Sequence, residues 1–141
     1  MIGLAICNEL FENWEFERVC GTVKALGYDG LEIAPFTLAP RVGAVTLAER
    51  DRLARVMSAH GLQCVGLHWL LAKTEGFSLT NPDSSIRRAT ADYLSELAEA
   101  TADLGGKVMV LGSPKQRDLI PGVTYEQGVA FLIEAMEHVL P

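Results

Sequence analysis

The sequence predicts an α/β fold in which four parallel strands are each followed by a helix, a (βα)4 unit. Three helix ends, in "KALGYDGLEI", "SAHGLQCVGLH" and "ADLGGKVMVLG", pass through glycine into a short β-rich run, and glycine at that position supplies a left-handed helix C-cap. The run VMVL at 108–111 is continuously apolar, as in a parallel strand covered on both faces. The stretches between strands are too long for hairpins and suit helical crossovers, which make neighbouring strands parallel.

The first half of the chain contains two such units. We expect strands near Ile2–Cys7 and Gly30–Ile33. Apolar residues at helical spacing predict the first helix: Phe16, Val19, Cys20, Val23 and Leu26. The second helix is expected from about Leu47 to His60, where the apolar pattern is weaker. Asn13 is expected to cap the first helix, and Thr46 followed by Glu49 has the form of a capping box at the second.

Two further units complete the chain, with strands expected near Gln63–His68 and Lys107–Leu111. The third helix is predicted by Tyr93, Leu94, Leu97, Thr101 and Leu104, and the fourth by Val129, Leu132, Ile133, Met136 and Leu140. Asp83 is expected to cap the third helix, and Thr124 with Gln127 repeats the capping-box form at the fourth. Residues 1–141 therefore read as a single (βα)4 unit, either a small open sheet or half of an eight-stranded barrel.

Composition narrows the class of protein. The chain has 141 residues, of which 49% are hydrophobic and 21% charged, which predicts an ordinary globular domain. A formal charge of −6 argues against nucleic acid as a partner. No segment approaches a membrane span and the N-terminus lacks the features of a signal peptide, so we expect a cytoplasmic protein. Cys7, Cys20 and Cys64 show no C-x-x-C spacing and are expected to be small core residues.

Polar residues gather where the predicted strands end. Because parallel strands point the same way, their C-terminal ends should form one rim, where α/β folds place ligands. The residues there are Asn8 and Glu9, then Glu32, Pro35 and Phe36, then His68 and Trp69, and finally Ser113, Lys115, Gln116 and Arg117.

Glu32 and His68 are the candidate catalytic residues of this rim. A carboxylate between Leu31 and Ile33 is costly to bury unless it is paired or binds a ligand, although an ion pair or an open edge would also account for it. His68 emerges at a strand end beside Trp69, whose ring could stack on a ligand. A single histidine is usually structural, but catalytic groups of this architecture come from the ends of several strands.

Two cations follow the fourth strand. Lys115 and Arg117 come after a Gly-Ser-Pro turn and could clamp a phosphate or carboxylate, with arginine giving a bidentate contact. The alternative is an exposed loop with ordinary solubilising charges.

The chain resembles the sugar phosphate isomerase/epimerase group of xylose isomerase-like TIM barrels, which also includes endonuclease-IV-type DNA repair enzymes. The resemblance lies in "AICNELF", "LGYDGLEIAPF", "VGLHWLL" and "VMVLGSPKQR". It implies a divalent metal, Mn, Co or Mg, that holds two oxygens of a ketose or hydroxy-carbonyl substrate while acid–base groups move a proton through an enediolate. It also implies that Asn8, Trp69, Ser113, Lys115 and Arg117 contact the substrate.

The same resemblance places the metal ligands on strands five to eight, so they are expected outside this chain, and no residue here is assigned to the metal. The fourth strand ends in Gly112 and Ser113, where the endonuclease branch has a histidine, which argues against DNA repair. The chain is therefore expected to pair with a missing C-terminal half or to form a homo-oligomer, and to be inactive alone. The alternatives are a non-catalytic module that self-assembles and binds a small ligand, and a dehydratase or lyase on the same barrel.

Overall fold

The computed structural model describes residues 3–140. It contains the parallel four-stranded sheet that the sequence predicts. Its strands are β1 (Ala5–Cys7), β2 (Gly30–Ile33), β3 (Gln63–His68) and β4 (Val108–Val110), all parallel and in the order β1-β2-β3-β4. The predictions for β2 and β3 are confirmed residue for residue. The outer strands are shorter than predicted, and Ile2, the expected start of the first, lies outside the described residues.

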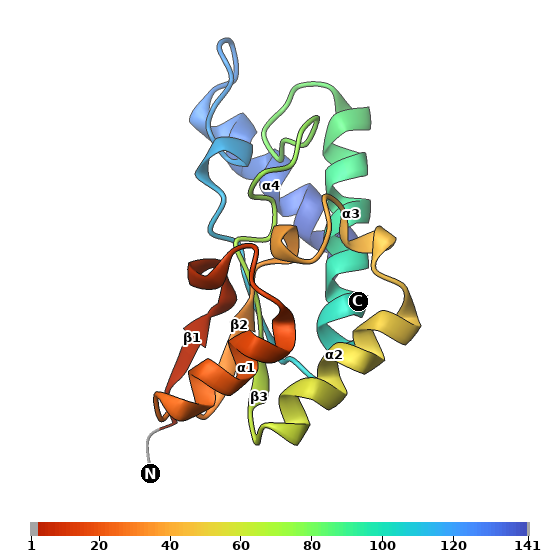
Figure 1. The fold of residues 1–141 in the computed structure, drawn as a ribbon. Coiled ribbons are helices and arrows are strands. Elements are labelled where there is room, and N and C mark those ends of the chain that lie inside the picture. Colours follow the sequence, from red (N-terminus) through yellow and green to blue (C-terminus); the bar gives the residue numbers. More distant parts are fainter. Residues whose placement is uncertain (1–2, 141) are drawn as a thin grey trace.

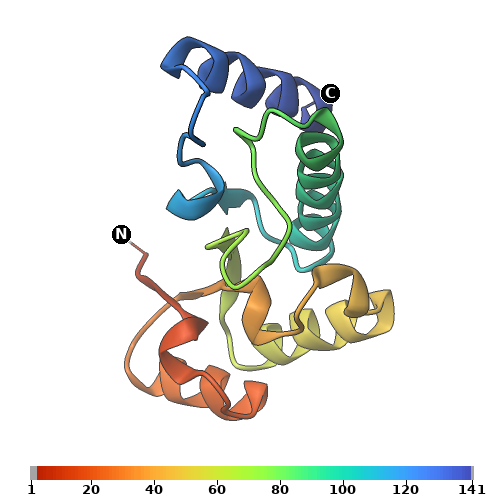
Figure 2. The same cartoon turned by 90° about the horizontal axis from the view of Figure 1, so that it is seen from above.

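Four helices follow the four strands: α1 (Phe16–Ala25), α2 (Leu47–Ala59), α3 (Ser84–Asp103) and α4 (Tyr125–Val139). They form an arc around the strands and leave the opposite face of the sheet uncovered (Figures 1 and 2). We call this uncovered side the open face. Short 3₁₀ turns directly follow β1, β2 and β4, at Asn8–Phe11, Pro35–Thr37 and Pro114–Gln116.

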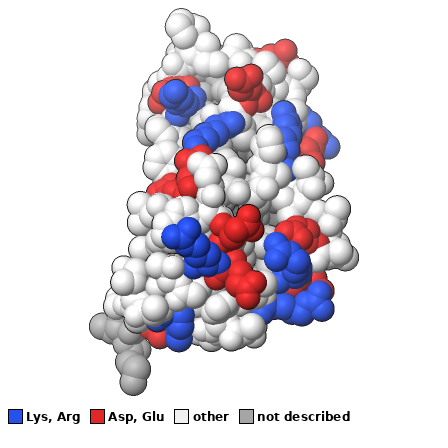
Figure 3. Space-filling model, in the orientation of Figure 1, with Lys and Arg blue, Asp and Glu red and all other residues white. Residues whose placement is uncertain are grey.

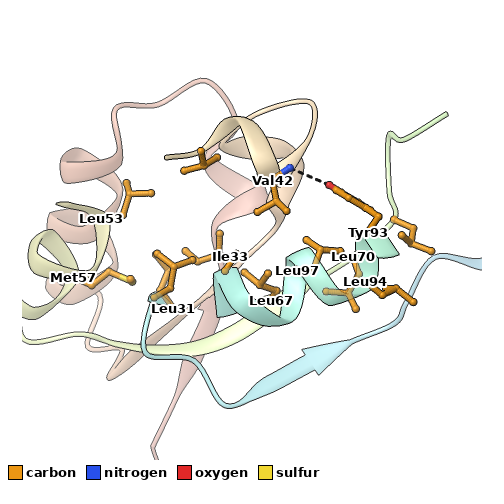
Figure 4. Close-up of a cluster of buried hydrophobic side chains, with 14 of the residues drawn as sticks. Leu31, Ile33, Val42, Leu53, Met57, Leu67, Leu70, Tyr93, Leu94 and Leu97 are labelled. Atoms are coloured by element: carbon orange, nitrogen blue, oxygen red, sulfur yellow. Dashed lines mark hydrogen bonds between the residues drawn. The ribbon is translucent and has the colours of Figure 1, made fainter. Parts of the chain in front are cut away.

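The core lies between the helices and the other face of the sheet. Alternate residues of the central strands, Leu31, Ile33 and Leu67, are fully buried there, because successive side chains of a strand point to opposite faces. They pack among helix side chains such as Met57 and Leu97. Figure 4 shows this cluster, together with the 3.2 Å hydrogen bond that the Val42 backbone N–H donates to the Tyr93 hydroxyl.

The caps of the later helices confirm the sequence signals. Thr124 and Gln127 form a full capping box at α4, and Asp83 accepts the Ser85 backbone N–H at the start of α3. Glycines at positive φ follow α1, α2 and α3, as the helix-end pattern predicted: Gly27, Gly61 and Gly105.

Two expectations for the earlier caps need correction. Thr46 accepts the Glu49 backbone N–H, but the Glu49 carboxylate pairs with Arg52 instead of closing the box. Asn13 does not cap α1: the N-cap is Glu15, without a side-chain bond, and Asn13 takes a left-handed φ of 68° in the preceding turn. Asparagine tolerates this conformation better than most residues. The turn before α1, and not a helix cap, therefore explains why position 13 is an asparagine.

The cysteines differ in burial more than expected. Cys20 is fully buried, whereas Cys7 and Cys64 are half-buried, and all three are free thiols. Burial raises the pKa of both Cys20 and Cys64 to about 11, so these two thiols are protonated at neutral pH.

Part of the apolar stripe predicted on α4 does not face the core. Leu132 and Met136 pack against it, but Val129, Ile133 and Leu140 are exposed. The helix packs mainly on α3. No helix within residues 3–140 is both long and apolar enough to cross a membrane.

Candidate functional site

The loops that follow all four strands enclose one cleft of about 500 Å³. This agrees with the placement of ligands at the carboxyl ends of parallel strands. The lining residues are Glu9, Leu10 and Glu12 after β1, Phe36 after β2, Trp69, Ala72 and Lys73 after β3, and Ser113, Pro114, Lys115 and Gln116 after β4. Three of the predicted substrate contacts, Trp69, Ser113 and Lys115, are therefore in the wall of this cleft.

The loop after β3 projects two side chains toward the cleft from strained positions. Trp69 and Lys73 have φ of 59° and 58°, a left-handed conformation that is rare for long side chains. Between them, Leu70 and Leu71 are buried, and the Leu71 backbone N–H donates to the Ser113 hydroxyl at 3.0 Å. Such strain persists where the surroundings fix it, and it concentrates at functional sites.

Two of the predicted substrate contacts are buried and bonded within the chain. Asn8 is 4% exposed; its side-chain oxygen accepts the Ala34 N–H at 2.8 Å, and its amide donates to the Thr37 hydroxyl at 2.7 Å. Ser113 is 2% exposed and accepts the Leu71 N–H. In this structure both side chains tie the rim loops together, and Asn8 is not in the cleft wall.

Glu32 and His68 lie together on the open face of the sheet. Each follows a residue that points into the core, so each points the other way. His68 Nδ1 is 3.6 Å from Glu32 Oε2, and the two side chains are 27% and 29% exposed. That distance is too long for a hydrogen bond, and among residues 3–140 the buried His68 Nδ1 has no hydrogen-bond partner.

The Glu32–His68 pair adjoins the cleft but does not line it. Its link to the cleft is Trp69, whose ring centroid is 6.1 Å from that of His68. On the other side, Cys7 is the register partner of Glu32 across β1 and β2. Burial raises the pKa of the Cys7 thiol, and the carboxylates of Glu9 and Glu32 raise it further, so Cys7 is a neutral neighbour of the pair.

The structure separates the two cations predicted to clamp an anion. Lys115 lines the cleft and makes no salt bridge within the described part of the chain. Arg117 ends the 3₁₀ turn after β4 and is not in the cleft wall. On the face seen in Figure 3, acidic and basic side chains are interspersed rather than gathered in one patch.

Five lining residues were not predicted from the sequence: Leu10, Glu12, Ala72, Lys73 and Pro114. Lys73 bonds Glu12 at 2.6 Å, although the two are 61 residues apart in the chain. Their charge, in loops that follow predicted strands, could have suggested both residues as candidates for the site. The local sequence does not show that the two side chains meet. Within residues 3–140, no three His, Cys, Asp or Glu side chains come close enough to hold a metal ion.

A parallel four-stranded sheet, an arc of outer helices and a cleft at the carboxyl strand ends together define one half of a TIM-barrel type of enzyme fold. A family model described as xylose isomerase-like TIM barrel matches residues 20–141. The chain belongs to this family, and the fold class and the family resemblance predicted from the sequence are confirmed.

A solved structure supports the same fold. The crystal structure of D-psicose 3-epimerase in the presence of D-fructose matches with a TM-score of 0.67 and 15% sequence identity. The match covers 98% of this chain and 48% of the epimerase chain, so the chain spans about half the length of that protein. A comparison with curated proteins finds no match.

Proposed function

We propose that this chain forms one half of a sugar isomerase or epimerase that acts on a ketose or hydroxy-carbonyl compound through an enediolate. The observation that carries the proposal is the cleft at the ends of all four strands, walled by Trp69 and Phe36 and adjoining the Glu32–His68 pair. Aromatic faces suit the apolar faces of a sugar ring, and the polar groups around them suit its hydroxyls. The structural likeness to a sugar epimerase supports this class.

In this proposal Glu32 and His68 supply acid–base groups from this chain. Isomerisation and epimerisation both begin when a base takes the proton from the carbon beside the carbonyl group, which leaves an enediolate. Return of a proton to the neighbouring carbon isomerises the sugar, and return to the opposite face of the same carbon epimerises it. Carboxylates and imidazoles are the side chains that most often act as general acids and bases, and these two lie 3.6 Å apart at the edge of the cleft.

The family resemblance implies a divalent metal, which would polarise the carbonyl group of the substrate. Such metals take at least four ligands in proteins. Glu32 and His68 offer two donor side chains, and the described residues contain no group of three. Within residues 3–140 a metal would lack a full set of side-chain ligands, and we propose that the remaining ligands come from outside this chain.

The proposed source is a second (βα)4 half that completes the barrel. The edge strands β1 and β4 carry no charged side chain, and the edge residues Leu4 and Val108 are exposed. Unprotected edges of this kind pair with further strands. The exposed apolar side chains of α4 would also be covered: Tyr125, Val129, Ile133 and Leu140.

Light scattering of the 141-residue chain tests this pairing. We expect the chain alone to associate weakly or aggregate, because its open face would be complementary to the proposed second half and not to another copy of itself. A stable dimer that binds sugar without turning it over would instead support the self-assembling module.

The test of the function is turnover of ketoses by the complete enzyme, meaning this half together with the proposed second half. With Mn²⁺, Co²⁺ or Mg²⁺ supplied, we expect this enzyme to interconvert D-fructose or a related ketose with an isomer or epimer. Chromatography of the sugars measures this conversion. Loss of water or carbon–carbon cleavage, without isomer formation, would favour the dehydratase or lyase instead.

A further inference from the structure

An ion pair joins two loops in the wall of the cleft. The Lys73 ammonium, from the loop after β3, donates to Glu12 Oε1 at 2.6 Å, from the loop after β1. Both side chains line the cleft and about half of each is exposed. Exposed pairs of this kind contribute little to stability, so stability does not account for this one.

A third loop fixes the position of the ammonium. Lys73 Nζ lies 4.4 Å from the ring centroid of Phe36, in the loop after β2, a cation–π distance. Within residues 3–140, Glu12 is the one hydrogen-bond acceptor of this ammonium. Because a lysine has three N–H donors, a donor remains for a ligand in the cleft.

The backbone holds Lys73 in this place. Lys73 has a left-handed φ of 58° and lies between the buried Leu71 and Thr74, whose hydroxyl donates to the Leu71 carbonyl at 2.6 Å. The position of the ammonium is thus set by its own loop and by two neighbouring loops before any ligand arrives, which is the kind of preorganisation that favours binding.

The charges of the cleft wall cancel. Its carboxylates are Glu9 and Glu12, and its ammonium groups are Lys73 and Lys115. A free ammonium such as Lys115 would attract a phosphate, but the Glu12 carboxylate at 2.6 Å neutralises Lys73 and, together with Glu9, repels an incoming anion. An uncharged sugar meets no such repulsion, and its hydroxyls can accept from Lys73 and donate to Glu12.

From this geometry we infer that the Glu12–Lys73 pair sets the specificity of the cleft for uncharged sugars over phosphorylated ones. The inference rests on the proposed function, in which the cleft binds a small sugar. It assigns Lys73 as a donor to a sugar hydroxyl and Glu12 as the group that positions Lys73 and excludes anions.

Calorimetric titrations of the complete enzyme with D-fructose and D-fructose 6-phosphate test the inference. The wild type should bind D-fructose more tightly than its phosphate. Glu12→Gln frees Lys73 and removes the repelling charge. This variant should bind D-fructose 6-phosphate at least about tenfold more tightly than the wild type does, and D-fructose more weakly. Lys73→Met keeps the aliphatic stem over Phe36 and should weaken both ligands by about tenfold.

Glu17→Gln is the matched control, since Glu17 is exposed on α1 outside the cleft wall and its replacement changes the net charge equally. It should leave both affinities unchanged. Suppose that D-fructose binds, but the ratio of the affinities for D-fructose and D-fructose 6-phosphate is the same in Glu12→Gln as in the wild type. This result would overturn the role of the pair and leave the proposed function standing. If neither sugar bound any of these proteins, the proposed function would be removed, and the role of the pair with it.

Discussion

Replacing Glu32 by glutamine in the complete enzyme is expected to lower kcat/KM by about a hundredfold or more, because general acid–base catalysis contributes about 10²–10⁴ in rate. Glutamine keeps the shape of the side chain but cannot take a proton. His68→Ala should also lower kcat/KM, since it removes the partner 3.6 Å from the carboxylate. Steady-state kinetics at saturating metal measure both effects.

The matched control is Glu99→Gln, because Glu99 is exposed on α3, which covers the opposite side of the sheet. It should retain wild-type kinetics. If Glu32→Gln and His68→Ala both did so as well, neither residue would take part in the reaction. A rise in KM at unchanged kcat would make them binding residues only.

Gly66→Ala is expected to destabilise the fold by about 3 kcal/mol or more, the range reached when a core is severely overpacked. Gly66 lies in β3 directly beside β4, and a Cβ there would overlap the Val108 carbonyl group. The backbone of β4 cannot yield without losing its pairing with β3. Equilibrium unfolding in urea measures this change.

Gly112→Ala provides the comparison for this variant. A Cβ at Gly112, just beyond β4, meets no atom within 4 Å, and its φ is not among the positive values. It should change the free energy of unfolding little. Equal stability of the two variants would show that the close approach of β3 and β4 relaxes at no cost.

The strands and helices were predictable because their signals are local. Glycine after each of the first three helices marks where the chain turns back, and the strands begin soon after it. Once the strands are parallel, their ends must meet at one edge, so Trp69, Ser113 and Lys115 could be placed at the site without knowing any contact.

What the sequence could not supply depends on contacts between distant residues. Trp69 and Lys73, with their left-handed φ, flank the buried Leu70 and Leu71, and the Lys73–Glu12 bond depends on the meeting of two loops. Similarly, helical spacing predicted the stripe on α4 but could not tell that Val129 and Ile133 would remain uncovered.

Proton exchange at the carbon beside the carbonyl group tests the proposed enediolate chemistry most directly. The complete enzyme would be incubated with D-fructose or a related ketose and Mn²⁺ in D₂O, and the proton spectrum of the sugar followed by NMR. We expect the signal at that carbon to disappear as deuterium enters, with wild-type protein and not with Glu32→Gln. Binding of these ketoses without exchange at that carbon would contradict the proposed enediolate mechanism.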